Sequence, residues 1–548
     1  MTRFGLLVSA LAAAAALPVR AAPPAPKLVV AISVDQFSAE LYQRYRPTFT
    51  GGLRRLGSGI AFTGYQSHAA TETCPGHSTI LTGRHPAGTG IVANTWLDAK
   101  TGSPVYCVAV PGASDPAARG PQNLRATTFG DWLKQAQPGA RVYSVSGKDR
   151  AAIMLGGHRA DGVYWWTGAD GFGTSTYAGP ATVAALAPVA AFNRALLARW
   201  RRRAPDLWPE PSAACAALEQ PHRFGDLTLS GKVPTDVARQ VETGDFIKSA
   251  GFQTFLRATP LYDAVTLALA ADVLKRARLG RGPATDLLAI SLSATDYVGH
   301  RYGNGGAEMC VQMAALDRAL GAFLDRLDRQ RVPYLVVLTA DHGSTDAAER
   351  EVEHGVAAIR LDPAAFVGAL NTALQQQLGL AAAPIVGEDP QQLSIRVGAD
   401  AALRARVRDA AVAWLKARPE VRAVFTAAEV AAAVPPPGKP ADQLSVIERF
   451  NESYDAERSG DIQVEYAERT SFGLPHAAGD AVAGHGSPWD HDRRVPILFW
   501  WPGAPGEPRG EPVETVDIAP TLAAITHVPT PRVDGTCLAM VTAGCGAR

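Results

Sequence analysis

The sequence predicts an α/β protein built on a doubly wound, mostly parallel β-sheet. Short apolar runs of strand length recur along the chain, and stretches of helical pattern follow them. This alternation of strand and helix is typical of parallel sheets with helices on both faces. At 548 residues with 47% hydrophobic residues, the chain can also bury a large core.

The predicted strands are residues 28–34, 141–147, 286–293, 334–340 and 495–501. A helix is expected after the first strand, over residues 41–57, and another over residues 309–329. In the second helix, apolar residues recur every three or four positions, so that one stripe packs on the sheet. That stripe consists of Met313, Leu316, Leu320, Phe323 and Leu327.

Two segments interrupt this alternation. Residues 156–259 are rich in aromatic residues, proline and glycine, and residues 362–451 are rich in alanine and contain AAAVPPPGKPAD near their end. Neither segment has the pattern of an independent domain. We therefore expect both to be cap segments inserted into a single α/β domain that spans residues 23–548.

The N-terminal residues 1–22 have the pattern of a secretory signal peptide. Arg3 precedes a short apolar run, and small residues surround a cleavage site near Ala21 or Ala22. An uncleaved membrane anchor is the alternative, but the apolar run is short for a bilayer span. No other run is long and apolar enough to cross a membrane. We expect a protein that is exported to the periplasm or secreted and is soluble once cleaved.

Charge and cysteine content limit the function further. The formal net charge is +1 and no basic stripe is present, which argues against a nucleic-acid partner. Export permits disulfides among the six cysteines, although their pairing cannot be read from sequence. Cys537 and Cys545 are close enough to form one such bond. No pair has the CxxC spacing of a zinc ribbon.

Acidic and histidine residues follow three of the predicted strands. Asp35 ends the first strand, Asp296 and His300 follow the third, Asp341 and His342 follow the fourth, and His485 lies in GHGSPWDHD. Residues past the carboxyl ends of parallel strands converge on one crevice. Six oxygen and nitrogen ligands suit two divalent ions, and mixed carboxylate and imidazole ligands favour Zn²⁺. Taken singly, each Asp could instead be a helix N-cap or a turn former.

Thr73, in AATETCPGHSTILTG, is the candidate nucleophile. It precedes Pro75 and Gly76, which would open a helix, and backbone N–H groups at a helix N-terminus stabilise an alkoxide and bind phosphate. Coordination to zinc would lower the pKa of the hydroxyl. Without the other motifs, the same segment is typical of an ordinary N-cap.

Several motifs, in their order along the chain, resemble the alkaline phosphatase superfamily, which shares its fold with type I phosphodiesterases. They are Asp35 after the first strand, TET-x-x-GH, GIVANTWLD, GKDR, TDYVGHRYG, TADHG and GHGSPWDHDRRVP. The resemblance is strongest to monomeric bacterial alkaline phosphatases with a threonine nucleophile, and it covers most of the chain after residue 22. It implies an exported zinc enzyme that hydrolyses small-molecule phosphate monoesters through a phospho-threonine intermediate and acts as a monomer.

The resemblance also implies a role for each site residue. Asp296, His300 and His485 would hold one Zn²⁺; Asp35, Asp341 and His342 would hold the other, with Thr73 as a further ligand. Asn94 would donate its amide to a phosphoryl oxygen, and Lys148 and Arg150 of GKDR would bind the remaining oxygens. A monoester dianion needs these two cations, whereas a diester carries an organic group there. The alternative is that KDR is a solvated turn.

Three rival functions follow from the same residues. A phosphodiesterase or nucleotide pyrophosphatase of the superfamily would lack GKDR. A sulfatase would need a C-x-P-x-R pattern, which TCPGHS around Cys74 does not supply. A non-catalytic metal-binding exported protein would need no nucleophile.

A few further residues lie close to these motifs in the sequence. His77 is expected to fix the nucleophile turn structurally. Asp490, His491 and Asp492 either orient His485 or form a polar loop. Tyr164, Trp165 and Trp166 either line the mouth of the pocket or pack the insertion.

Overall fold

The computed structural model describes residues 25–174, 182–235, 246–389, 391–398 and 400–546. At its centre lies a nine-stranded sheet with the order β19-β2-β18-β11-β1-β10-β5-β6-β7. The strands are β19 (Glu507–Arg509), β2 (Ile60–Tyr65), β18 (Arg494–Trp500), β11 (Tyr334–Thr339), β1 (Leu28–Val34), β10 (Asp286–Leu292), β5 (Val142–Ser146), β6 (Gly162–Gly168) and β7 (Gly171–Gly173). In this sheet β18 and β7 alone oppose the common direction, which confirms the predicted α/β fold with a mostly parallel sheet.

All five predicted strands are strands of this sheet. The first has the predicted bounds, and the other four differ from the prediction by about one residue at their ends. Four of them are neighbours in the order β11-β1-β10-β5 and run parallel. The fifth, β18, pairs antiparallel with β11. Its direction matters for the site, because the start of β18 lies at the edge where the parallel strands end.

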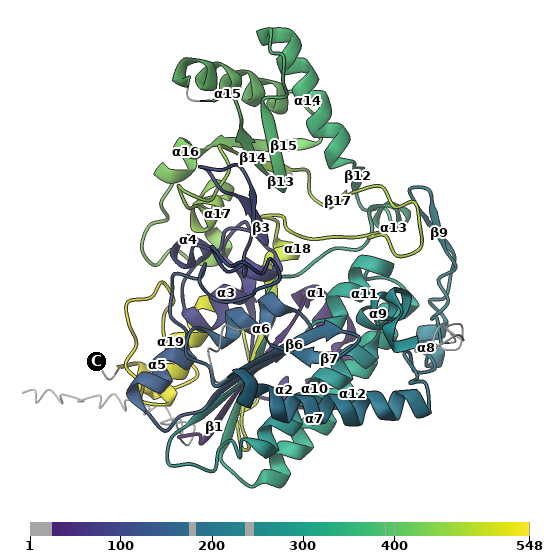
Figure 1. Ribbon diagram of the computed structural model, residues 1–548, viewed down its shortest axis with the longest axis vertical. Coiled ribbons are helices and arrows are strands. Elements are labelled where there is room, and N and C mark those ends of the chain that lie inside the picture. The colour runs from purple at the N-terminus through teal and green to yellow at the C-terminus, as the bar shows by residue number, and fades with distance from the viewer. Residues whose placement is uncertain (1–24, 175–181, 236–245, 390, 399, 547–548) are drawn as a thin grey trace, which may run out of the picture.

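Helices cover both faces of the sheet. Alternate strand residues point to opposite faces, and apolar residues on each face pack against these helices. Val30 and Ile32 of β1 belong to one core, whereas Val29 and Ala31 belong to the other. The first face packs against α1 (Ala39–Tyr45), α2 (Gly52–Leu56), α7 (Thr182–Arg202), α10 (Pro260–Arg276) and α12 (Ala307–Gln330). The second packs against α3 (Thr73–Thr82), α5 (Phe129–Ala136), α6 (Asp149–Gly156) and α19 (Ile518–Ile525). Figure 1 shows these helices on either side of the sheet.

Strand β10 alternates in the same way. Leu288, Ile290 and Leu292 lie in the first core, and Leu287 and Ala289 lie in the second. The strand is therefore buried on both faces, as expected for a central strand of a parallel sheet. This explains why its sequence is a nearly continuous apolar run.

The predicted helix over residues 309–329 is confirmed as α12, and its five-residue apolar stripe is buried. The continuous helix predicted over residues 41–57 is wrong. The chain there forms α1, a single 3₁₀ turn (Arg46–Thr48) and the short α2. Pro47 and the Gly51–Gly52 pair interrupt the helical pattern, and both residue types disfavour a continuous helix.

A second, four-stranded sheet lies at the top of the molecule in Figure 1. Its order is β13 (Ile385–Asp389), β14 (Gln392–Ile395), β16 (Ile462–Tyr466) and β15 (Val421–Thr426), all antiparallel. Helices α14 (Pro363–Leu378) and α15 (Ala401–Lys416) share a hydrophobic core with it. Most of this unit comes from residues 362–451. By contrast, residues 156–259 supply β6 and β7 to the main sheet and α7 to one of its faces. The cap boundaries inferred from the sequence remain a prediction.

All six cysteines form disulfides in the described part of the chain. Cys537 pairs with Cys545, as predicted, and the other bonds are Cys74–Cys107 and Cys215–Cys310. The predicted signal peptide, residues 1–22, lies outside the described residues. Among those that are described, no helix combines the length and hydropathy needed to span a bilayer.

The start of α2 depends on one buried carboxylate. Asp317 of α12 accepts hydrogen bonds from the backbone amides of Thr50 (2.8 Å), Gly51 (2.7 Å) and Leu53 (2.7 Å), while α2 has no side-chain cap of its own. We predict that Asp317→Ala lowers the free energy of unfolding by about 2–3 kcal/mol, because these amides lose a charged acceptor. Thermal unfolding followed by calorimetry measures this loss.

Asp325→Ala is the matched control on the same helix. The Asp325 side chain is 64% exposed and lies 3.7 Å from Arg55, so its removal should change stability by less than about 0.5 kcal/mol. Equal melting temperatures for the two variants would show that Asp317 does not stabilise α2.

Candidate active site

The predicted site residues leave the main sheet at a single edge. Asp35 follows β1, Asp341 follows β11, Lys148 follows β5, and Asp296 lies in α11 (Ala294–Tyr302) directly after β10. Thr73 begins α3, which follows the parallel strand β2, and His485 lies in the loop before the antiparallel strand β18. The sheet therefore gathers residues that are hundreds of positions apart in sequence.

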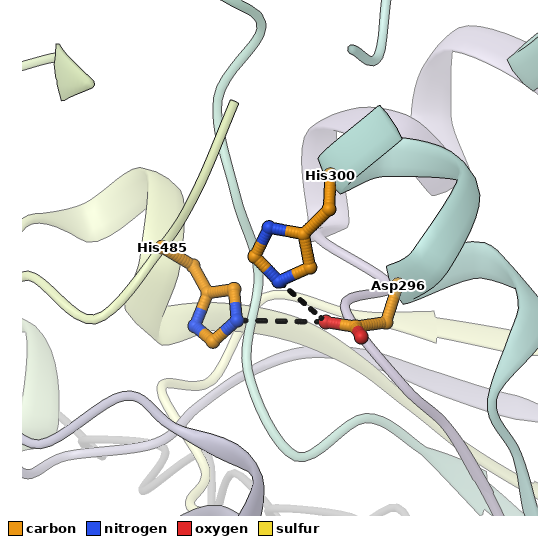
Figure 2. A group of neighbouring side chains, drawn as sticks. All are labelled: Asp296, His300 and His485. Carbon is orange, nitrogen blue, oxygen red and sulfur yellow. Dashed lines mark ion pairs between the residues drawn. The ribbon is translucent and has the colours of Figure 1, made fainter. Parts of the chain in front are cut away.

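Asp296, His300 and His485 form one group of possible metal ligands (Figure 2). Asp296 Oδ1 lies 3.3 Å from His300 Nε2 and 3.5 Å from His485 Nε2. Asp296 and His300 are four residues apart on α11, so one helical turn brings them to the same face. All three potential ligand atoms lie within 4.8 Å of one another.

Asp35, Asp341 and His342 form the second group, and all three are buried. His342 Nε2 lies 3.5 Å from Asp35 Oδ1 and 3.4 Å from Asp341 Oδ2. Asp35 Oδ1 and His342 Nε2 have no hydrogen-bond partner among the residues described. Buried polar atoms that face one another without partners are costly unless a cation binds them. The two groups adjoin, because the rings of His342 and His485 stack with centroids 3.6 Å apart.

The second ring nitrogen of each histidine contacts the backbone. His300 Nδ1 lies 2.8 Å from Ala483 O, His342 Nδ1 3.0 Å from Gly343 O, and His485 Nδ1 2.8 Å from Thr71 O. A carbonyl oxygen accepts, so Nδ1 must carry the proton and Nε2 keeps its lone pair. Burial lowers the pKa of His342 to about 3, so this ring is neutral at physiological pH. The backbone thus selects the tautomer that a metal ligand needs.

Lys148 connects the two groups of ligands. Its Nζ lies 2.7 Å from Asp35 Oδ2 and 2.5 Å from Asp296 Oδ2. Burial alone would lower the pKa of Lys148, but Asp296 and Asp35 raise it above its ordinary value, so the amine stays charged. Burial and the neighbouring Asp341 nevertheless raise the pKa of Asp35 well above its ordinary value. The Asp35 carboxylate therefore favours further positive charge beside it.

Thr73 lies within reach of the two basic side chains of the GKDR motif, Lys148 and Arg150. Lys148 Nζ is 3.4 Å and Arg150 Nη2 is 3.3 Å from Thr73 Oγ1. A close backbone approach holds α3 against the end of β11: a Cβ atom at Gly76 would lie 1.9 Å from Asp341 O. Glycine at position 76 is therefore required for this packing. The structure brings Thr73, Lys148 and Arg150 together as the motifs predict.

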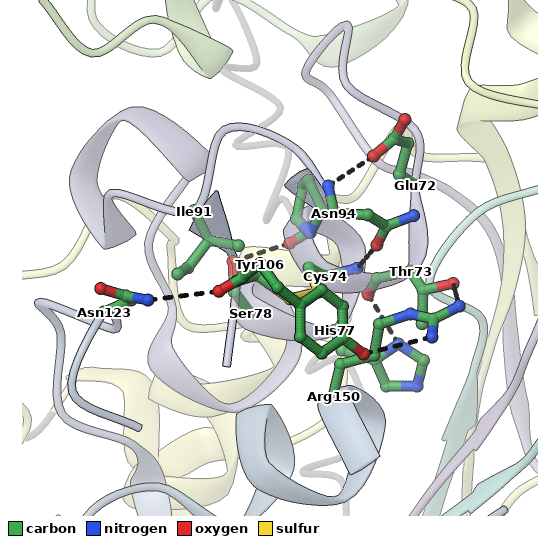
Figure 3. The surroundings of a disulfide bond; sticks show 12 residues. Glu72, Thr73, Cys74, His77, Ser78, Ile91, Asn94, Tyr106, Asn123 and Arg150 are labelled. Atoms are coloured by element: carbon green, nitrogen blue, oxygen red, sulfur yellow. Dashed lines mark hydrogen bonds between the residues drawn. A yellow bond between two sulfur atoms is a disulfide. The ribbon is translucent and has the colours of Figure 1, made fainter. Parts of the chain in front are cut away.

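Asn94 lies beside the same helix turn (Figure 3). Its side-chain Oδ1 accepts a hydrogen bond from Cys74 N (2.9 Å), and its backbone amide donates to Glu72 Oε2 (2.6 Å). With Oδ1 occupied, the orientation of the amide is fixed. Its Nδ2 makes no hydrogen bond to a described residue, so it is available as a donor next to Thr73.

The Cys74–Cys107 disulfide and Tyr106 are features that the sequence did not reveal as part of the site. The disulfide joins the first turn of α3 to the segment that carries Tyr106. Tyr106 OH donates to Asp149 Oδ1 (2.7 Å) and accepts from Arg150 Nη1 (3.4 Å), which positions Arg150. Only the proximity of Cys74 to Thr73 could have suggested this connection. Because Cys74 is bonded to Cys107, it is not a free sulfatase-type cysteine.

His77 and Asp492 lie beside the two groups of possible metal ligands. His77 Nδ1 lies 2.9 Å from Thr73 O and 3.0 Å from Asp341 Oδ2, which agrees with its expected structural role. Asp492 Oδ2 accepts hydrogen bonds from Gly486 N (3.1 Å) and Ser487 N (2.8 Å). Asp492 therefore fixes the loop that carries His485, while the histidine ring itself bonds to the Thr71 carbonyl.

A pocket of about 590 Å³ opens next to Lys148 and Arg150. Trp165 and Trp166 line it, whereas Tyr164 lines a different pocket. The two tryptophans thus fit the expectation of a pocket wall, and Tyr164 does not. The volume is sufficient for a small organic molecule.

Comparison with known proteins identifies the family. The family model for type I phosphodiesterase / nucleotide pyrophosphatase matches residues 29–487. Alkaline phosphatase PhoK from a Sphingomonas species is 44% identical over 94% of this chain and 91% of its own length. Alkaline phosphatase PhoD from Zymomonas mobilis is 41% identical over 93% of this chain and 88% of its own length.

The fold has related structures as well. The crystal structure of wild-type alkaline phosphatase PafA superposes with a TM-score of 0.81. The match covers 95% of this chain and 100% of that structure, at 26% identity. These findings confirm the predicted superfamily and the prediction of an enzyme. The chain belongs to the type I phosphodiesterase / nucleotide pyrophosphatase family, within the alkaline phosphatase superfamily, and is a phosphatase.

Proposed function

We propose that this phosphatase is an exported, zinc-dependent alkaline phosphatase that hydrolyses phosphate monoesters with Thr73 as its nucleophile. The observation that carries the proposal is the approach of two cations, Lys148 and Arg150, to Thr73 Oγ1 at 3.4 and 3.3 Å. Two groups of carboxylate and imidazole ligands lie directly beside this contact. A hydroxyl surrounded by this much positive charge is suited to attack an anionic phosphoryl group.

The ligand groups fit two zinc ions. Their mixed oxygen and nitrogen atoms suit Zn²⁺, and unpartnered buried atoms at Asp35 and His342 support a cation there. One ion would be held by Asp35, Asp341 and His342 with Thr73, and the other by Asp296, His300 and His485. When bound, the ions would supply positive charge that lowers the pKa of the Thr73 hydroxyl and offsets the charge of the phosphoryl group.

The protein residues then have separate roles. Thr73 gives up its hydroxyl proton to solvent, and Oγ1 forms a bond to phosphorus while the bond from phosphorus to the ester oxygen breaks; the leaving alkoxide takes up a proton and departs as the alcohol. Lys148 and Arg150 bind the non-bridging oxygens of the phosphoryl group, and Asn94 Nδ2 donates to one of them. Water then cleaves the phospho-threonine and releases phosphate. Tyr106 keeps Arg150 in place during both steps.

The paired cations favour monoesters over diesters. A monoester presents two unesterified charges beyond the attacked position, and Lys148 and Arg150 can compensate both. A diester has an organic group in place of one charge. The family model also covers phosphodiesterases, so diester hydrolysis is the second candidate activity. The relatives at 44% and 41% identity are both named alkaline phosphatases, which favours the monoester.

The proposal also covers the location of the protein, its oligomeric state and the role of its inserted segments. Three disulfides are typical of proteins in oxidising compartments, which supports export to the periplasm or secretion. We further propose that the enzyme acts as a monomer on small-molecule substrates. Residues 156–259 and 362–451 would serve as caps around the catalytic domain.

Metal removal should abolish activity and destabilise the fold. We predict that dialysis against a chelator eliminates monoester hydrolysis, because Thr73 then keeps its ordinary pKa. Loss of a ligand present at about 100 times its Kd also removes about 2.7 kcal/mol of stability. Metal analysis, activity and calorimetry on one preparation measure these effects. Zn²⁺ should restore activity and melting temperature together, and full activity in metal-free protein would contradict the prediction.

Replacing the nucleophile should separate chemistry from metal binding. We predict that Thr73→Ala abolishes phosphate monoester hydrolysis while the zinc content stays near two per chain, because six other ligands remain. The matched control is Thr73→Ser, which keeps a hydroxyl and should retain part of the activity. Metal analysis and p-nitrophenyl phosphate hydrolysis report the two properties. Wild-type activity in Thr73→Ala would rule out covalent catalysis by this residue.

Arg150 is the cleaner probe of substrate charge, because Lys148 also contacts Asp35 and Asp296. We predict that Arg150→Ala lowers kcat/KM for p-nitrophenyl phosphate by about ten- to a hundredfold, since a charge-assisted hydrogen bond is lost. The loss for bis-p-nitrophenyl phosphate should be much smaller. Arg150→Lys keeps the charge and should fall in between. Equal losses on both esters would refute the claim that Arg150 compensates the second charge of a phosphate monoester.

A further inference from the structure

Arg257 is a cation of the pocket that the proposed phosphoryl chemistry does not use. The charged side chains that line this pocket are Asp115, Arg119, Lys148, Asp149, Arg150 and Arg257. Arg119 pairs with Asp149 at 3.1 Å, and Lys148 pairs with Asp35 and Asp296. Arg257, in contrast, makes no ion pair or hydrogen bond with a residue that the structure describes, and its Nε is sealed from solvent without an acceptor.

The helix that carries Arg257 is firmly held. Helix α9 (Ala250–Arg257) begins after Ser249, whose hydroxyl accepts a hydrogen bond from Phe252 N (3.0 Å). Phe252 and Leu256 are buried in the first core of the main sheet. On another face of the helix, Gln253 Oε1 accepts from Trp166 Nε1 (2.8 Å). Arg257 lies four residues after Gln253 and so shares its face, toward the tryptophan wall of the pocket.

Arg257 and the proposed phosphoryl-binding residues line the same pocket wall. Burial raises the pKa of Tyr262, and the charge of Arg257 opposes that effect. Tyr262 OH donates to Gly147 O (2.7 Å), directly before Lys148. The Tyr262 ring also lies 6.1 Å from that of Tyr297, which lines the pocket. Arg257 therefore shares one pocket with Lys148 and Arg150, and Tyr297 lies in the same wall.

We propose that Arg257 is a specificity-determining residue that binds a second anionic group, carried by the leaving portion of the substrate. This inference rests on the proposed function, because Lys148 and Arg150 must hold the phosphoryl group that is hydrolysed. The favoured substrates would be phosphate monoesters whose organic part bears a carboxylate or a further phosphate. A planar guanidinium binds either group through two parallel hydrogen bonds. Trp165 and Trp166 would contact the organic body between the two charges.

Matched pairs of substrates test this directly. Phenyl phosphate is compared with 3- and 4-carboxyphenyl phosphate, and butyl phosphate with 1,4-butanediol bisphosphate, in the wild type, Arg257→Gln and Arg257→Lys. The quantity of interest is the ratio of kcat/KM for the anionic member to kcat/KM for its parent. We expect Arg257→Gln to lower this ratio by about tenfold, the effect of one charge-assisted contact. Arg257→Lys should lower it less, and the two arms show whether carboxylate or phosphate is preferred.

Arg276→Gln is the control, because Arg276 is a half-exposed cation on α10 that pairs with Asp272 and lies outside this pocket. It should leave every ratio at the wild-type value. Equal losses on parent and anionic substrates in both Arg257 variants would overturn the inference while leaving the proposed function intact. A wild-type enzyme with no activity on phenyl phosphate would overturn the proposed function, and this inference with it.

Discussion

The site depends on the convergence of strand ends at one edge of the main sheet. Four neighbouring parallel strands, β11, β1, β10 and β5, direct Asp341, Asp35, Asp296 and Lys148 to that edge in the same order. Because β18 runs antiparallel, the His485 loop that precedes it arrives at the same place. Ligands from distant parts of the sequence are therefore positioned by backbone hydrogen bonds of the sheet, which give a more rigid framework than loops alone.

Convergence also concentrates charge, and the surrounding residues are arranged to tolerate it. Three buried carboxylates lie within the two ligand groups, and Lys148 contacts two of them. Burial disfavours their ionised forms, so each must have a cation nearby. Backbone carbonyls meanwhile hold the three histidines with Nε2 free to bind a cation. The arrangement is costly as a structural element, which supports the proposed binding of metal ions and an anionic substrate.

Much of this could be predicted from the sequence, because the strands are short, apolar and followed by chemically distinctive residues. The six predicted ligand residues gather in two groups, five of them just after parallel strands and His485 in the loop before β18, and the GKDR cations reach Thr73. Two kinds of feature could not be predicted. Long-range contacts, such as the Cys74–Cys107 bond and the Tyr106 support of Arg150, have no local pattern. The start of α2 likewise depends on Asp317, which lies far along the chain in α12.

The most direct test of the central claim is anomalous X-ray scattering at the zinc edge on crystals of the native protein. Two peaks are predicted, one at about 2.0–2.1 Å from the Nε2 atoms of His300 and His485 and one at the same distance from His342 Nε2. The second should also lie beside Thr73 Oγ1. A single peak, or peaks remote from either ligand group, would contradict the assignment of a two-metal site.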